Sequence, residues 1–108
     1  MRDIVEYEEA FGKRVVERAD KMKAKYGDLL LTKVVGDDDG VYATIVSERD
    51  HKAKYAVKIT KDSAFCSCPA FEPRSPCKHL IYLLMVLKDK APPLFERAEE
   101  MMFKLYGR

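Results

Sequence analysis

The chain has 108 residues, with 20 lysines and arginines against 18 aspartates and glutamates, and a formal net charge of +2. Hydrophobic residues at 47% and charged residues at 35% are typical of one soluble, folded domain, 1–108, with a salt-rich surface, and do not indicate disorder. No run reaches the roughly 18 apolar residues of a membrane span, and the first residues do not begin the apolar core of a signal peptide. We therefore expect no membrane contact and a cytoplasmic protein, or a nuclear one if the source is eukaryotic. With so small a net charge, any basic surface must be local.

The N-terminal segment, 1–27, carries apolar residues three or four positions apart, which predicts one amphipathic helix over residues 3–26. Asp3 and Glu6 fit a capping box at its start, and Gly27 fits its end. Gly12 inside it costs about 1 kcal/mol relative to alanine. We expect the stripe to pack on the sheet and leave open that it contacts a partner or a second copy of the chain. Its members are Ile4, Tyr7, Phe11, Val15, Ala19, Met22 and Tyr26.

Four short segments after this helix predict an antiparallel sheet. Residues 29–35 and 41–47 are rich in apolar and β-branched side chains and flank a glycine-bounded turn, which is a hairpin pattern. Residues 53–60 alternate, with Tyr55, Val57 and Ile59 on one face and lysines on the other. Residues 63–66 form a short fourth strand.

The fourth strand leads into the part of the chain with the clearest chemistry, since all three cysteines and one of the two histidines lie there. Cys66 and Cys68 on extended chain present both sulfurs on one face. Eight residues with three prolines then return the chain to Cys77 and His79. Three thiolates and an imidazole suit tetrahedral zinc, so the spacing predicts a zinc site.

A helix is expected over about residues 78–88, because an apolar run follows a proline that suits a first helical position. Ser75 and Pro76 read as N-cap and first residue. Residues two apart on a regular helix point about 200° apart. We therefore place Cys77 in non-helical geometry and His79 in the first turn.

Two other interpretations of the cysteines are simpler. They could be small apolar core residues, or Cys66 and Cys68 could form a redox pair. Neither gives Cys77 and His79 a joint role, so the zinc interpretation is preferred.

The C-terminal segment, 91–108, begins with Ala91 and two prolines, which end the preceding helix, and continues as a helix over residues 94–106. Its apolar stripe is rich in methionine, which packs in cores and also adapts to irregular partners. The expected fold class is α+β: a small antiparallel sheet of about four strands with a zinc knuckle leading into a helix, flanked by an N-terminal and a C-terminal helix.

The region 28–90 resembles the SWIM zinc finger, whose signature is Cys-x-Cys, a variable gap and Cys-x-His. Residues 55–59, 65–71 and 76–80 are similar to the strand, knuckle and helix of that family. The resemblance implies zinc bound by Cys66, Cys68, Cys77 and His79. It also implies relatives among DNA-handling and chromatin factors, ubiquitin-ligase components, and adaptors of RecA-like recombinase paralogues.

Basic residues gather on and around the third strand, with five lysines and arginines but one aspartate between residues 49 and 61. Together with two cations beside the metal they suit phosphate contacts, and Tyr42 offers a plane for stacking. Lysines on such a strand can instead prevent edge-to-edge aggregation, and we leave this alternative role of the strand lysines open. The candidate nucleic-acid contacts are Lys52, Lys54, Lys58, Lys61, Arg74 and Lys78.

Four protein ligands fill a tetrahedral zinc, so we expect a structural metal, no enzyme activity and no small-molecule substrate. The first hypothesis is a zinc module that binds nucleic acid, DNA in the first place, as an accessory factor in recombination or repair. The second is an adaptor that binds a protein such as a RecA-like ATPase through its helices. Pairing of the chain with itself is left open.

Overall fold

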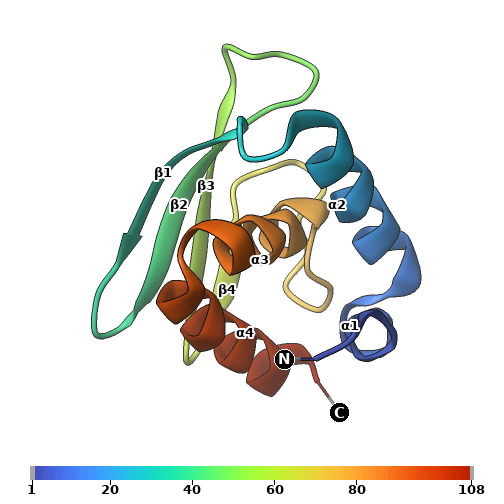
Figure 1. Ribbon diagram of the computed structural model, residues 1–108, viewed down its shortest axis with the longest axis vertical. Coiled ribbons are helices and arrows are strands. Elements are labelled where there is room, and N and C mark those ends of the chain that lie inside the picture. The colour runs from blue at the N-terminus through green and yellow to red at the C-terminus, as the bar shows by residue number, and fades with distance from the viewer. Residues whose placement is uncertain (1, 108) are drawn as a thin grey trace.

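A computed structural model describes residues 2–107 and contains four helices and one sheet in that range (Figure 1). The α+β prediction is confirmed. The elements are α1 (Ile4–Phe11), α2 (Lys13–Tyr26), β1 (Leu31–Gly36), β2 (Gly40–Val46), β3 (Lys54–Thr60), β4 (Ala64–Cys66), α3 (Lys78–Lys90) and α4 (Pro92–Tyr106). The sheet is antiparallel throughout, in the order β1-β2-β3-β4.

The molecule has two layers, with the helices gathered on one side of the twisted sheet (Figure 1). The inner face of the sheet is apolar because alternate residues of β2 and β3 point inward, as the period of two predicted. Helix α4 packs on these two strands, and α3 packs between α4 and α2. The buried residues of the inner face are Val41, Ala43, Ile45, Val57 and Ile59.

Helix α3 is buried on nearly every side, as its apolar run predicted. It ends at Lys90, and Ala91 is both its C-cap and the N-cap of α4. The two prolines therefore open α4 as its first residues, two positions before the predicted start. None of the helices between residues 2 and 107 combines the length and apolar character needed to cross a bilayer.

The N-terminal segment is two helices, so the prediction of one continuous helix was wrong. Gly12 separates α1 from α2 with φ of 102° and ψ of 131°, a conformation open to glycine and strained for other residues. The predicted capping box is present, because Glu6 N donates to Asp3 Oδ1 at 2.9 Å and Asp3 N donates to Glu6 Oε1 at 3.3 Å. Gly27 ends α2 with φ of 61°, as expected.

The break at Gly12 turns α1 away from the line of α2 and places it against α4. Phe11 contacts Phe103 edge to face, with 4.8 Å between the ring centroids. The Tyr7 hydroxyl donates a hydrogen bond of 2.6 Å to the Glu99 carboxylate. The first and last helices of the chain are therefore joined directly.

Candidate metal centre

The first two cysteines are placed by the end of the sheet. Cys66 is the last residue of β4, and Ser67 continues the pairing with β3: its N–H donates to the carbonyl of Ala56 at 3.0 Å. In return the N–H of Ala56 donates to Ser67 Oγ at 2.9 Å. The alternation of extended chain leaves Ser67 exposed and buries Cys66 and Cys68 on the same side. This is the fork of sulfurs that the spacing predicted.

The loop between the two ligand pairs is folded on itself. The N–H of Phe71 donates a hydrogen bond of 3.2 Å to the carbonyl oxygen of Cys68. The N–H of Ser75 donates one of the same length to the carbonyl oxygen of Glu72. The Phe71 ring also packs edge to face on Phe65 of β4, 5.5 Å away. These contacts return the chain to the fork.

The second ligand pair lies where α3 begins. Cys77 is the N-cap, with φ of −84° and ψ of 167°, so its backbone is extended and its side chain is outside the helical spiral. His79 lies in the first turn, as expected. The prediction that Ser75 caps this helix and Pro76 begins it was wrong, because both precede the cap. Helix α3 instead starts at the metal ligand, without a side-chain cap hydrogen bond.

The four candidate ligand atoms lie within 4.8 Å of one another, and all four residues are buried. Nδ1 of His79 is 3.6 Å from the Cys66 sulfur and 3.7 Å from the Cys77 sulfur. A tetrahedral zinc with bonds of about 2.3 Å to sulfur and about 2.0 Å to nitrogen requires about 3.6 Å between these ligand atoms. The geometry and the soft donor set therefore fit zinc.

The pKa values of the thiols follow from their closeness. Hydrogen bonds from Cys66 and from His79 stabilise the Cys77 thiolate and lower its pKa. The hydrogen bond to Cys77 and burial raise the pKa of Cys66. Burial and the charge of Cys77 raise the pKa of Cys68. Three thiols this close do not ionise together without a cation, so binding of a metal displaces protons from them.

Polar and aromatic neighbours surround the centre. The ring of Tyr55 lies 4.9 Å from the His79 ring, which limits the orientations open to the imidazole. Lys78 Nζ donates to Glu48 at 2.7 Å, linking α3 to the loop after β2. A hollow of about 390 Å³ beside the cysteines is lined by Tyr55, Glu48, Lys78, Arg18 and Arg49 among others. The sequence placed Tyr55 on the inner face of its strand but gave no sign of its contact with His79, since 24 positions separate them.

The six predicted phosphate contacts do not lie on one surface. Lys54 and Lys58 are on the outer face of β3, opposite the buried residues. Lys52 and Lys61 lie in the turns before and after that strand, and Arg74 lies in the loop between the ligand pairs. Lys78 begins α3, on the helix side of the sheet, and is paired with Glu48.

Comparison with known proteins agrees with this geometry. Residues 55–88 match the model of the SWIM zinc finger family, and this match includes all four clustered residues. No curated protein and no solved structure matched the chain. The family match and the Cys and His cluster together identify the metal of this site as zinc.

Proposed function

Because residues 55–88 of this chain are a SWIM zinc finger, we propose that it is a structural-zinc module that contacts nucleic acid, DNA in the first place. Its role would be that of an accessory factor in DNA transactions such as recombination or repair.

The zinc is proposed to hold the fold and not to carry a reaction. Four protein ligands complete a tetrahedral coordination and leave no position for water or substrate. The ion would join the end of β4 to the start of α3, and its favourable binding energy would belong to folding. We accordingly propose no enzyme activity and no small-molecule substrate. Thiolate ligands suit the reducing conditions of the cytoplasm.

One observation supports the nucleic-acid contact above the others: the four strands contain three lysines and no aspartate or glutamate. Lys33, Lys54 and Lys58 all belong to the outer face of the sheet, where no helix covers them. Strands whose charged residues are all positive attract the phosphate backbone even though the whole chain is nearly neutral.

Fluorescence anisotropy tests this proposal. Zinc-loaded protein is titrated into labelled single-stranded and duplex DNA at about 50 mM and about 200 mM salt, and the affinity should fall steeply with salt. The double variant Lys54→Gln/Lys58→Gln should bind more weakly and show a shallower salt slope. The double variant Lys21→Gln/Lys88→Gln removes the same charge from exposed helix positions and should bind like the parent. Absence of binding to either DNA at low salt would contradict the proposal.

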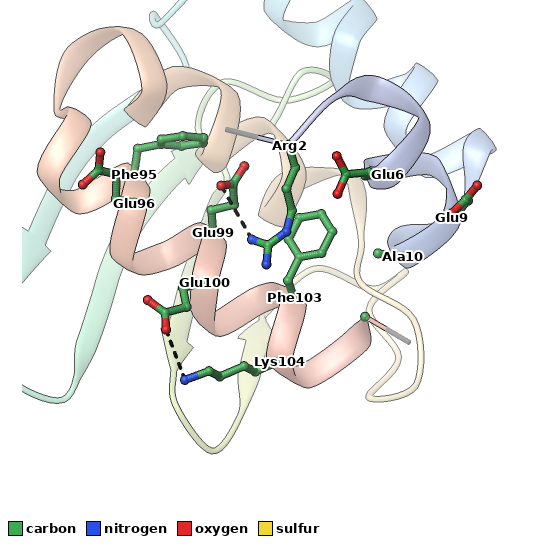
Figure 2. Close-up of a pocket in the computed structure, with 11 residues that line it drawn as sticks. Arg2, Glu6, Glu9, Ala10, Phe95, Glu96, Glu99, Glu100, Phe103 and Lys104 are labelled. Carbon is green, nitrogen blue, oxygen red and sulfur yellow. Dashed lines mark ion pairs between the residues drawn. The ribbon is translucent and has the colours of Figure 1, made fainter.

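A groove between α1 and α4 favours the second candidate, a protein adaptor. It has a volume of about 1040 Å³ and is lined by five glutamates, with Arg2 and Lys104 as the basic residues among them (Figure 2). Arg2 lies over the Phe103 ring and 3.7 Å from Glu99, so part of the charge is balanced. The remaining acidic rim suits a partner with lysines or arginines on its surface. The glutamates are Glu6, Glu9, Glu96, Glu99 and Glu100.

Charge reversal separates the two candidates. Glu9→Lys/Glu96→Lys changes exposed positions of the groove and should abolish capture of a protein partner from the native source if the adaptor role holds. The same variant should leave binding of DNA unchanged or strengthen it. Lys54→Gln/Lys58→Gln should have the opposite effects.

A further inference from the structure

The outer face of the sheet carries a straight row of four side chains, one from each strand. Val35 pairs with Tyr42, Tyr42 with Lys58, and Lys58 with Phe65. Residues directly opposite each other on paired strands point to the same face, so the four lie side by side across the sheet. We call them the outer row.

The outer row is accessible, although two of its members are large and apolar. Phe65 is 43% exposed and Val35 is 48% exposed, while Tyr42 and Lys58 are half-buried. All four helices lie on the other side of the sheet (Figure 1). An exposed apolar and aromatic row on a face whose other residues include Lys33, Lys54, Thr44, Ala56 and Val46 indicates a binding surface.

The spacing of the row suits nucleotides. Strands lie about 4.8 Å apart, so Tyr42 and Phe65, separated by β3, stand about 10 Å from each other with Lys58 between them. Two aromatic faces on either side of one cation match two bases and the phosphate that joins them. Bases reach such faces only when they are unstacked and unpaired, as in a single strand.

The metal centre holds one end of the row. Phe65 directly precedes Cys66, and the Phe71 ring from the loop between the ligand pairs packs against it at 5.5 Å. Zinc bound at Cys66 and Cys68 would restrain the backbone before and after these ligands, and with it the positions of both rings. This gives the structural metal a direct effect on the proposed binding surface.

The charge around the row favours one end of the sheet for a bound phosphate backbone. The turn between β1 and β2 contains Asp37, Asp38 and Asp39, and the turn after β3 contains Lys61 and Asp62, at the same end of the sheet because Gly40 pairs with Thr60, so this end carries a net negative charge. Lys33 and Lys54 lie toward the opposite end. A phosphate backbone would run on the lysine side and keep clear of the aspartates.

We propose that the outer row binds single-stranded nucleic acid by stacking bases on Tyr42 and Phe65 while Lys58 contacts the phosphate between them. This rests on the proposed function, and it narrows the ligand from nucleic acid in general to unpaired strands.

The test uses the full zinc-loaded chain and labelled oligo(dT), oligo(rU) and a duplex of equal length. Both single strands should bind at least about tenfold more tightly than the duplex if stacking dominates, and their ratio tells DNA from RNA as the ligand. Tyr42→Leu and Phe65→Leu keep an apolar side chain but remove the aromatic plane. Each should weaken single-strand binding about fivefold or more, with the salt slope unchanged. Tyr26→Leu, a half-buried tyrosine on α2, is the matched control and should bind like the parent.

A second readout does not depend on how the leucine variants fold. The chain contains no tryptophan, so Phe65→Trp introduces a single fluorescent indole in the row. Its emission should be quenched by oligo(dT) through stacking and left unchanged by the duplex. No binding of any nucleic acid would overturn the proposed function together with this inference. Equal affinity for duplex and single strands, with no effect of the leucine variants, would overturn the inference alone. A parent dimer in gel filtration that Phe65→Leu splits would also overturn it, since the row would then be a contact between copies.

Discussion

Cys77 and His79 are two positions apart, yet the sulfur of one lies 3.7 Å from Nδ1 of the other. On a regular helix these side chains would point to nearly opposite sides. They meet because Cys77 has extended backbone and His79 occupies the first turn of α3, so the N-terminus of the helix falls between the two ligands. The position of that end is therefore part of the metal site.

Removal of zinc should destabilise the fold strongly. The ion joins β4 to α3, and structural zinc contributes on the order of 10 kcal/mol or more at neutral pH. Cys68→Ala or treatment with a chelator should abolish the one bound zinc and lower the melting temperature by more than about 10 °C. Calorimetry and elemental analysis of the same samples measure both effects.

The control for this change is Ser75→Ala. Ser75 lies in the same loop, is exposed and contributes its backbone N–H to the turn with Glu72. This variant should keep its zinc and melt within a few degrees of the parent. An unchanged melting temperature after verified loss of zinc from Cys68→Ala would refute a structural role for the metal.

The sequence predicted those features that depend on local periodicity. Alternation in β3 assigned Val57 and Ile59 to the core, and the Cys-x-Cys and Cys-x-His pairs indicated a common site, because both follow from spacing along the chain. The break at Gly12 could not be predicted in this way. The apolar stripe continues past it, and one glycine costs a helix only about 1 kcal/mol, so the local pattern favours a continuous helix.

Contacts between distant segments could not be predicted from local periodicity, because they depend on how separate elements pack and pair. Tyr7 and Glu99 are 92 positions apart, and the outer row requires the register of three strand pairs. A shift of one residue in any pair would move Phe65 or Tyr42 to the other face. The start of α3 was misplaced because Ser75 and Pro76 satisfy the usual preferences for a helix start, whereas the structure has Cys77 as the N-cap and begins the helix at Lys78.

The Tyr7 and Glu99 pair should make stability depend on pH in the alkaline range. Burial, and then the hydrogen bond and charge of Glu99, raise the pKa of Tyr7 well above its usual value. Below pH about 10 the hydroxyl is protonated in both folded and unfolded chains, and its contribution is complete. Above that pH the unfolded chain loses the proton while the folded chain keeps it, so stability falls by up to about 1.4 kcal/mol per pH unit.

Urea unfolding of the parent and of Tyr7→Phe at several pH values from 7 to about 11 measures this effect. At pH 7 the variant should be less stable by about 1 to 2 kcal/mol, because the buried Glu99 loses a hydrogen-bond donor. The difference should shrink as the pH rises above about 10. A difference that stays constant to pH 11 would mean that Tyr7 ionises equally in both states.

Two glycines in the first hairpin should respond differently to alanine. A Cβ at Gly40 would overlap the backbone carbonyl of Ile59 on the paired strand, which cannot move without separating β2 from β3. A Cβ at Gly36 would meet the end of the Leu94 side chain, which can rotate away. Gly40→Ala should therefore cost about 2 kcal/mol or more, and Gly36→Ala clearly less. Equal losses of stability for the two variants in thermal unfolding would argue against the close contact between Gly40 and the backbone of Ile59.

Gly12→Ala sets helix propensity against backbone strain, and the two predict opposite signs. Propensity alone predicts that alanine stabilises a helix by about 1 kcal/mol relative to glycine. The φ of 102° at Gly12 disfavours any residue with a Cβ, although the space around it is open, which predicts a loss of about 1 to 3 kcal/mol.

We expect the loss, because α1 must turn at Gly12 for Tyr7 and Phe11 to reach α4. Chemical unfolding measures the sign, and far-ultraviolet circular dichroism measures helix content. Lys13→Ala at the next, exposed position has regular helical backbone and should change stability by less than about 0.5 kcal/mol. If Gly12→Ala instead gained both stability and helix content, α1 and α2 would have merged into one helix, and the contact between α1 and α4 would be dispensable.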